Sequence, residues 1–368
     1  MWSFSIHTTI SGTKLLDVQP SAGSWRRALG GGGSGQHTLQ LRAVGEEISP
    51  ATARQLSEPN QASLVVCWGD VVLYAGAIIK ADYKRSTGAL TVRHNEGLRE
   101  ILRNRSTFGV GAESGIGAGY AGGDLVVSGR SASGAVRAIL HRGAGGYWGG
   151  TWDLPIDLPA DGAGPISFTW RRWDFHMIDD LLGQIEDLGY EIDFRPYLTA
   201  AGALRYQTVV ASKITAGLLE FAVTAERTPV TELSVSRDGS KQLSGVFTLG
   251  KGSEDKMLKG GAGFMDGPVI PVRDAVVSMK DVANVSRLNE MATAELTQRR
   301  HPSEQWDFSL VAEVDEDGVE QLDVAALIPG ATMRMLSSGD EYITDGVHPL
   351  RLVGISGDMS RTLKPEVQ

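Results

Sequence analysis

Apolar residues along this 368-residue chain fall mostly in short runs that glycine and polar residues interrupt, a pattern typical of β-strands. In residues 63–94, SLVVCWGDVVLYAGAIIKADYKRSTGALTVRH, the breaks come at Gly69-Asp70, at Gly76 and at the STG triplet. This spacing predicts a β-meander. Ahead of it, the segment HTLQLRAVG alternates leucine with polar residues at the period of a half-buried strand.

Two later stretches predict strand pairs. YEIDFRPYLTAAGALRYQTVVAS has a turn signal at Ala201-Gly202, and QWDFSLVAEV is followed by VEQLDVAAL after the acidic turn at 315–318. A weak likeness between residues 64–93 and 329–362 suggests a duplicated strand module.

Three stretches follow the helical period instead. Apolar side chains recur on one face in residues 95–102, 174–188 and 284–300. The second stretch ends at Gly189, a good C-terminal glycine, and the third is followed by Pro302. We expect these helices to cover sheets rather than to form a bundle.

Composition and charge exclude several classes of protein. The hydrophobic content of 42% is that of an ordinary globular chain, with length for roughly two or three domains. The 35 basic against 44 acidic residues leave a charge of −9, which disfavours a nucleic-acid-binding role. The start resembles no signal peptide and no apolar run has the length of a membrane span, so we expect a soluble protein made in a cytoplasm. The one cysteine, Cys67, lies in an apolar run and is expected to be buried as a thiol.

The segment GVFTLGKG, residues 245–252, has part of the spacing of a phosphate-binding loop. Such a loop needs Ser or Thr after the lysine and a helix behind it. Here Gly252 follows Lys251, and the spacer residues favour an extended strand. The segment therefore predicts a strand that runs into a loop.

Other motifs also lack their context. Residues 117–122 satisfy GxGxxG but precede a strand-like run instead of following one, which favours a loop. The acidic run at 313–318 resembles the start of a calcium loop, yet a valine stands where the bidentate Glu is needed. His176 with Asp179 or Asp180 has helical metal-ligand spacing but no supporting motif. We therefore predict no catalytic, cofactor-binding or metal-binding residue.

Two regions are rich in glycine: RRALGGGGSGQ near the start and residues 109–124. Such runs are typical of flexible loops or arms. Just beyond the second run, Tyr147, Trp148 and Trp152 lie close together in the sequence. These rings are expected either to pack a glycine-rich loop onto a core or to form a surface that recognises host glycans.

The order of segments resembles a known family. YAGAIIKADYKRSTGALTVRHNEGLREILRNRSTFG is followed by a mid-chain helix with GYEIDFRPY, then by AELTQRRHPSEQWDFSL and IPGATMRM. This order is similar to that of minor tail proteins of long-tailed (siphovirus) actinobacteriophages and, more distantly, of phage baseplate hub proteins.

The resemblance implies a mainly β fold with α+β insertions, in which two small, tail-tube-like β-barrel modules flank a helix-containing middle domain. We expect the first module at 1–108, a glycine-rich loop with the middle domain at 109–215, and the second module at 216–368, with its helix near 284–300. Strand-rich modules with exposed edges must pair or cover them, which ring assembly would do.

The implied role is a structural virion protein at the tail tip, assembled in the host cytoplasm. A homotrimer would place six modules in a ring that continues the tail tube. Its implied partners are a distal tail protein, a tape measure protein and other minor tail or fibre proteins, with DNA only passing through the lumen. The acidic balance suits such a channel.

Two rival classes stay open. A tail-associated cell-wall hydrolase would release sugar or peptide from host cell walls. A glycan-binding module of the tail tip would lose binding, and keep its fold, when Trp148 and Trp152 are replaced.

Overall fold

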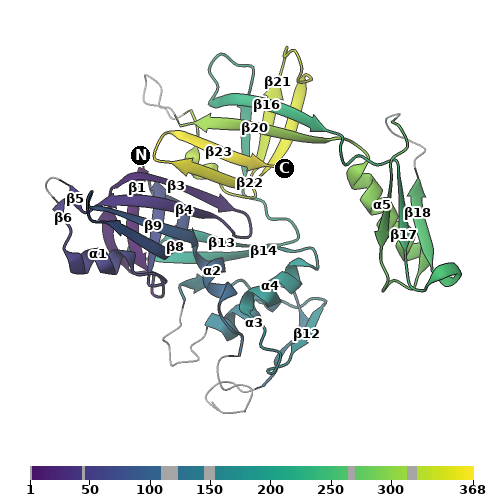
Figure 1. The fold of residues 1–368 in the computed structure, drawn as a ribbon, viewed down its shortest axis with the longest axis horizontal. Helices are drawn as coiled ribbons and strands as arrows, with labels where there is room; N and C mark the ends of the chain where they lie inside the picture. Colours follow the sequence, from purple (N-terminus) through teal and green to yellow (C-terminus); the bar gives the residue numbers. More distant parts are fainter. Residues whose placement is uncertain (1, 44–45, 109–122, 145–153, 264–269, 313–320) are drawn as a thin grey trace. The chain divides into compact units, whose positions relative to one another are not determined.

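The computed structural model describes residues 2–43, 46–108, 123–144, 154–263, 270–312 and 321–368, and the chain is mainly β (Figure 1). It divides into two compact units, the larger formed by Met1–Glu232 with Phe308–Gln368 and the smaller by Leu233–Asp307. The three-part division expected from the sequence stays a prediction.

The N-terminal strands of the larger unit form one antiparallel sheet in the order β3-β4-β9-β8-β7-β1-β2. They are β1 (Trp2–Thr8), β2 (Lys14–Val18), β3 (Pro20–Ala28), β4 (Ser34–Gln40), β7 (Ala62–Trp68), β8 (Val71–Lys84) and β9 (Ala89–Glu96). β7, β8 and β9 form the predicted meander. A short ribbon, β5 (Arg42–Ala43) with β6 (Glu46–Glu47), and helix α1 (Pro50–Ser57) lie between β4 and β7 in the chain. The strands at the two ends of this sheet, β2 and β3, are separated in sequence by Gln19 alone, and the described residues show no pairing between them.

Aromatic rings from five of these strands pack against one another. Phe4 of β1 lies 5.4 Å from His37 of β4, and Trp25 of β3 lies 6.0 Å from Tyr74 of β8, measured between ring centroids. His94 of β9 stacks on His37 at 5.1 Å. Because β1 and β4 are not neighbours, and neither are β3 and β8, these contacts require the sheet to be curled around its core. We call this sheet the first strand module.

Two histidines and a tyrosine form a buried hydrogen-bonded chain in this core. His37 Nδ1 and His94 Nε2 are 2.9 Å apart, and the Tyr74 hydroxyl lies 2.8 Å from His94 Nδ1. Burial lowers the pKa of His37 to about 4 and that of His94 to about 3. Both imidazoles are therefore neutral at pH 7, and His94 donates through one ring nitrogen and accepts through the other.

Three glycines make the room for these rings. A Cβ on Gly23 would lie 2.1 Å from His37 Cδ2, and one on Gly76 would lie 2.2 Å from the Tyr74 hydroxyl oxygen. A Cβ on Gly35 would meet His94 Cε1 at 2.5 Å. The predicted break at Gly76 is therefore wrong, since β8 continues through this residue. The glycine leaves room for the Tyr74 ring and does not form a turn.

The glycine run after β3 also differs from expectation. Gly30, Gly31 and Gly32 have φ angles of 77°, 92° and 99° and make the ordered turn into β4. Gly33 closes this turn, since its N–H donates to the Glu96 carboxylate at 2.9 Å. The run is a tight turn between paired strands, not a flexible arm.

The C-terminal strands repeat the order of the first module. Their sheet runs β16-β20-β23-β22-β21-β15. They are β15 (Leu218–Ala222), β16 (Val230–Asp238), β20 (Ser303–Val311), β21 (Thr332–Ser337), β22 (Gly346–Asp358) and β23 (Thr362–Val367). The meander β21-β22-β23 corresponds to β7-β8-β9, and β20 and β16 correspond to β4 and β3, in agreement with the predicted duplication. The copies differ in that β15 is parallel to β21, whereas β1 is antiparallel to β7. We call this sheet the second strand module.

The prediction of a strand at VEQLDVAAL is wrong. Residues Val324–Ala326 form a 3-10 helix, and the Asp323 side chain accepts a hydrogen bond from Ala325 N at its start. Aspartate before the run favours this local cap over an extended chain.

β22 joins the two strand modules. It pairs antiparallel with β3, from Gly354 opposite Ala28 to Asp358 opposite Ser24. A single sheet of 13 strands therefore runs through both modules.

Between the modules in sequence lies an α+β region, which begins at Gly97, inside the residues expected for the first module. It contains helices α2 (Gly97–Arg103), α3 (Ala132–Ala144) and α4 (Ile178–Glu186), the pair β10 (Leu125–Arg130) with β12 (Ile166–Trp170), and the sheet β11-β14-β13. The strands of that sheet are β11 (Ile156–Asp157), β13 (Glu191–Leu198) and β14 (Leu204–Ala211). α4 buries Leu181, Leu182 and Ile185, the predicted stripe, against this core. α3 was not predicted, since its sequence is rich in Ala, Ser and Gly and has a weak apolar period.

The smaller unit contains parts of β16 and β20 and, between them in sequence, a three-stranded sheet with one helix. β17 (Gly245–Leu249) lies between β18 (Lys259–Gly263) and β19 (Asp274–Ser278), and α5 (Val285–Arg299) is the third predicted helix. GVFTLGKG is β17 followed by a loop, as predicted, and a single 3-10 turn at Glu254–Lys256 stands where a phosphate-binding loop would need a helix.

The first prediction concerns the ring-packing glycines. Gly23→Ala should lower the free energy of unfolding by about 1–3 kcal/mol, because its methyl group overlaps the His37 ring. Gly183→Ala is the matched control: it lies in α4 with no atom within 4 Å of its Cβ position, and should raise stability by about 0.5–1 kcal/mol. Urea unfolding measures both values, and equal effects would contradict the packing described here.

The second prediction concerns acid stability. A histidine whose folded pKa is depressed stabilises the fold above pH 6.5, and this contribution is lost as the pH falls toward the folded value. Replacing His37 by Gln should therefore make the free energy of unfolding less dependent on pH between pH 6 and 4.5, by about 1.4 kcal/mol per pH unit. Comparison with the wild-type chain cancels the titration of groups that do not contact His37. Parallel curves for the two proteins would contradict a neutral buried His37.

Candidate functional site: a polar cleft at the joint between the strand modules

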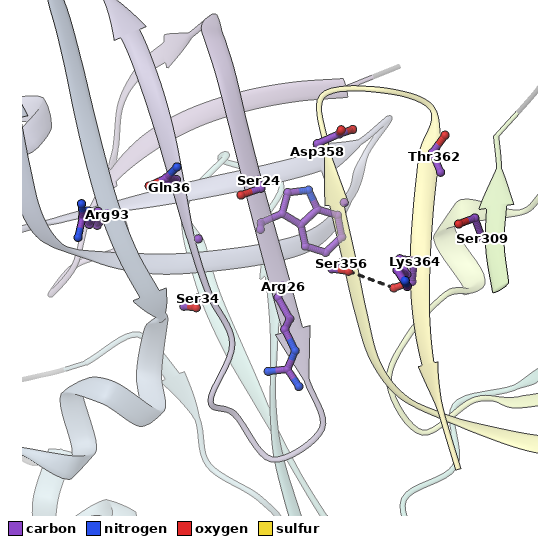
Figure 2. Close-up of a pocket in the computed structure, with 13 residues that line it drawn as sticks. Ser24, Arg26, Ser34, Gln36, Arg93, Ser309, Ser356, Asp358, Thr362 and Lys364 are labelled. Carbon is purple, nitrogen blue, oxygen red and sulfur yellow. Dashed lines mark hydrogen bonds between the residues drawn. The ribbon is translucent and has the colours of Figure 1, made fainter. Parts of the chain in front are cut away.

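The joined sheet is hollowed on one face where β3 meets β22. The cleft has a volume of about 720 Å³. Figure 2 shows the side chains around it. Its lining residues come from β3, β4, β9, β20, β22 and β23. They are Ser24, Trp25, Arg26, Ser34, Gly35, Gln36, Arg93, Ser309, Ser356, Gly357, Asp358, Thr362 and Lys364. Most are small or polar, which distinguishes the cleft from an apolar ligand pocket.

Strand alternation explains this polarity. Trp25 and Ile355 point into the core and are almost fully buried. Their neighbours Ser24, Arg26 and Ser356 therefore point to the opposite face, because successive side chains alternate across a sheet.

The register arranges the cleft residues in two cross-strand rows. In one row Arg26 is opposite Ser356, and Ser356 is opposite Lys364. In the other, Gln36 of β4 lies opposite Arg93 of β9. The three cations, Lys364, Arg26 and Arg93, thus lie on alternate strands of the sheet, β23, β3 and β9. Alternate strands of a sheet are roughly 10 Å apart.

The cleft is cationic although the chain is acidic. Arg26 is neutralised by Glu366, to which its Nε and Nη2 donate at 2.5 and 2.6 Å, and this bond lowers the pKa of Glu366. Arg93 is exposed and makes no ion pair with any residue that the structure describes. Among the residues that line the cleft, the three basic side chains of Arg26, Arg93 and Lys364 outnumber the one acidic side chain, Asp358.

Behind β3, a buried arginine ties the first module to the middle region. Arg27 is 3% exposed, and its Nη2 lies 3.3 Å from Asp193 Oδ2 on β13. Its Nε lies 3.8 Å from Glu96 Oε1 at the end of β9. Burial raises the pKa of Glu96 to about 7, although Arg27 and the backbone N–H groups of Ala28 and Gly33 act in the opposite direction.

A second arginine ties the second module to the same strand. Arg351 of β22 donates through Nη1 to Glu191 of β13 at 2.6 Å and also pairs with it through Nη2. The Glu191 carboxylate further accepts from Ile214 N at 2.6 Å, and the pairing with Arg351 lowers its pKa. β13 therefore holds both modules, one through Asp193 and the other through Glu191.

Several residues singled out in the sequence lie outside the described residues. These are Tyr147, Trp148 and Trp152, the GxGxxG segment and the acidic run at 313–318. Their roles stay predictions.

The other singled-out side chains have structural partners. Asp179 lies 2.5 Å from Arg99, and His176 lies 3.8 Å from Asp174. The described part of the chain contains no cluster of three or more side chains that could hold a metal ion. Cys67 is buried as predicted, and burial raises the pKa of its thiol to about 11.

Sequence reasoning missed the cleft itself. Its residues alternate with core residues and are indistinguishable in the sequence from an ordinary solvent-facing pattern.

The described helices include none with the length and hydropathy needed to cross a membrane.

No protein-family model and no curated protein matches this sequence. Solved structures do match it. A 43 kDa tail protein of prophage MuSo2 from Shewanella oneidensis superposes with a TM-score of 0.60 at 12% identity, over 99% of this chain and 97% of that one. A tail protein from Neisseria meningitidis superposes with a TM-score of 0.54 at 16% identity, over 100% and 96% of the two chains.

This chain has the fold of phage tail proteins. A chain of the lidless PdpA–VgrG complex of Francisella also shares it, with a TM-score of 0.54 at 9% identity over 64% of that longer chain. The predicted resemblance to tail proteins is thus confirmed at the level of the fold. The mainly β class is confirmed as well.

The third prediction concerns the buried arginine. Arg27→Met should cost about 3–5 kcal/mol in the free energy of unfolding, because it removes the one buried cation that pairs with both carboxylates. Glu96 then has no cation beside it, and Asp193 keeps only the partly exposed Arg195, whose Nε lies 3.4 Å away. The control is Glu220→Gln, which breaks the half-exposed pair with Arg334 and should change stability by less than about 1 kcal/mol. Similar small losses in both variants would contradict a buried ionic link between β3 and β13.

Proposed function

We propose that this chain is a structural virion protein: a hub at the tip of a phage tail that continues or closes the tail tube. The observation that carries the proposal is the match of nearly the whole chain to nearly the whole length of two phage tail proteins. The segment order in the sequence adds the narrower assignment to a long-tailed phage of actinobacteria.

The internal duplication supports a ring. Each chain has two strand modules of the same strand order, already joined by the pairing of β3 with β22. Three chains would supply six such modules around one axis, and repeated pairing would cover sheet edges that a single chain leaves exposed. We propose that the modules act as tail-tube-like barrels in a homotrimer.

The proposed partners follow from this position. A distal tail protein and the tape measure protein would contact the hub on the tube side, and fibre or other minor tail proteins on the side of the host. The similarity to a chain of a complex with VgrG supports association with further tail or spike proteins. DNA would only pass through the lumen, and assembly would take place in the host cytoplasm.

We further propose that the chain is not an enzyme, and we assign it no cofactor. The carboxylates at the joint support this, because Asp193, Glu191 and Glu366 are each engaged by an arginine. Such carboxylates hold the fold and are not free to act as acid and base.

The fourth prediction tests the hub. Light scattering over a concentration series should give a mass three times the 39.3 kDa of the chain, and host cell walls incubated with the protein should release neither sugar nor peptide. A strict monomer that releases cell-wall fragments would contradict the hub and favour a tail-associated hydrolase.

A further inference from the structure

A compact acidic loop connects β21 to β22. Residues 338–345 contain Asp340, Glu341 and Asp345 and no lysine or arginine. Asp340 accepts from the backbone N–H of Tyr342 at 2.8 Å and of Ile343 at 2.7 Å, and these bonds lower the pKa of its carboxyl. The loop is therefore ordered and negatively charged at neutral pH.

An aromatic side chain projects from this loop. Tyr342 is 67% exposed, although large aromatic rings usually bury most of their surface. Exposed tyrosines are typical anchors of protein–protein interfaces.

The loop and the cleft lie at opposite ends of the same strand. The loop leads into Gly346, where β22 begins, and Ser356 and Asp358 line the cleft where β22 ends. Thirteen strand residues span roughly 40 Å. The loop therefore lies too far from the cleft of its own chain to enter it.

The two surfaces are complementary. The cleft is concave, floored by small polar side chains and flanked by Arg93 and Lys364. The loop carries three carboxylates and an exposed ring. Complementary charge of this kind selects partners and orients them.

We propose that the loop of one copy docks in the cleft of a second copy, with Glu341 facing Arg93. This inference rests on the proposed homotrimer and names the contact that builds it. Because the loop and the cleft are different surfaces, the contact is heterologous, and repeating it closes a ring when the rotation between copies allows closure. In a closed ring, every loop is docked and every cleft is occupied.

A charge exchange tests the contact. Arg93→Glu and Glu341→Arg should each weaken self-association about tenfold or more, because each places like charges together. The double variant should return to within about threefold of the wild-type chain. Neither side chain has an ion-pair partner within the described residues, so circular dichroism should show both single variants folded. Lys84→Glu, an exposed reversal on β8 outside the cleft, is the matched control and should leave self-association unchanged.

The outcomes separate the two proposals. If the trimer forms and neither single reversal weakens it, the loop-in-cleft contact is wrong while the hub stands. Weakening by both reversals without recovery in the double variant would also overturn the contact, because the two charges would not then face each other. A wild-type chain that stays monomeric at every concentration would overturn both.

Discussion

The backbone pairing of β3 with β22 is the constraint on which the rest of the structure depends. It joins residues more than 300 positions apart in the sequence. Without it, β3 would leave an unpaired row of N–H and C=O groups at the edge of the first module. β22 can cover that edge because it is long: its first half pairs with β21, and its second half pairs with β3 and β23. The cleft exists only because of this joint.

Two arginines, Arg27 and Arg351, fix the joint by pairing with carboxylates of β13. Removing these charged groups from water costs free energy. Arg27 and Arg351 reach the same strand, β13, from the two modules, and each meets a carboxylate there. The Arg27–Asp193 pair is buried, and the Arg351–Glu191 pair is partly exposed. Ion pairs withdrawn from water add little net stability compared with apolar packing, but they penalise any arrangement that separates the partners. They therefore fix the orientation of both modules against the middle region. The proposed hub would need that fixed geometry to stack on its neighbours in a ring.

Local pattern predicted the elements, and long-range pairing escaped it. The meander at 63–94 and helix α4 have clear periods, so their type follows from the sequence. Gly76 was misinterpreted because a glycine that admits a ring inside a strand has the same local sequence as one that makes a turn. The cleft had no signal at all, since Arg26 and Ser356 meet only after two distant strands have paired. The weak likeness between the two meanders was the one sequence feature that pointed to the larger architecture.

Amide hydrogen exchange of the intact chain measures whether both modules form one continuous sheet in solution. Peptides covering Pro20–Ala28 and the second half of Gly346–Asp358 should exchange as slowly as the buried meander β7-β8, and should lose protection together with it. Fast exchange at β3 and β22 beside a protected β7-β8 meander would mean that the modules are joined by a loose tether and not by a shared sheet.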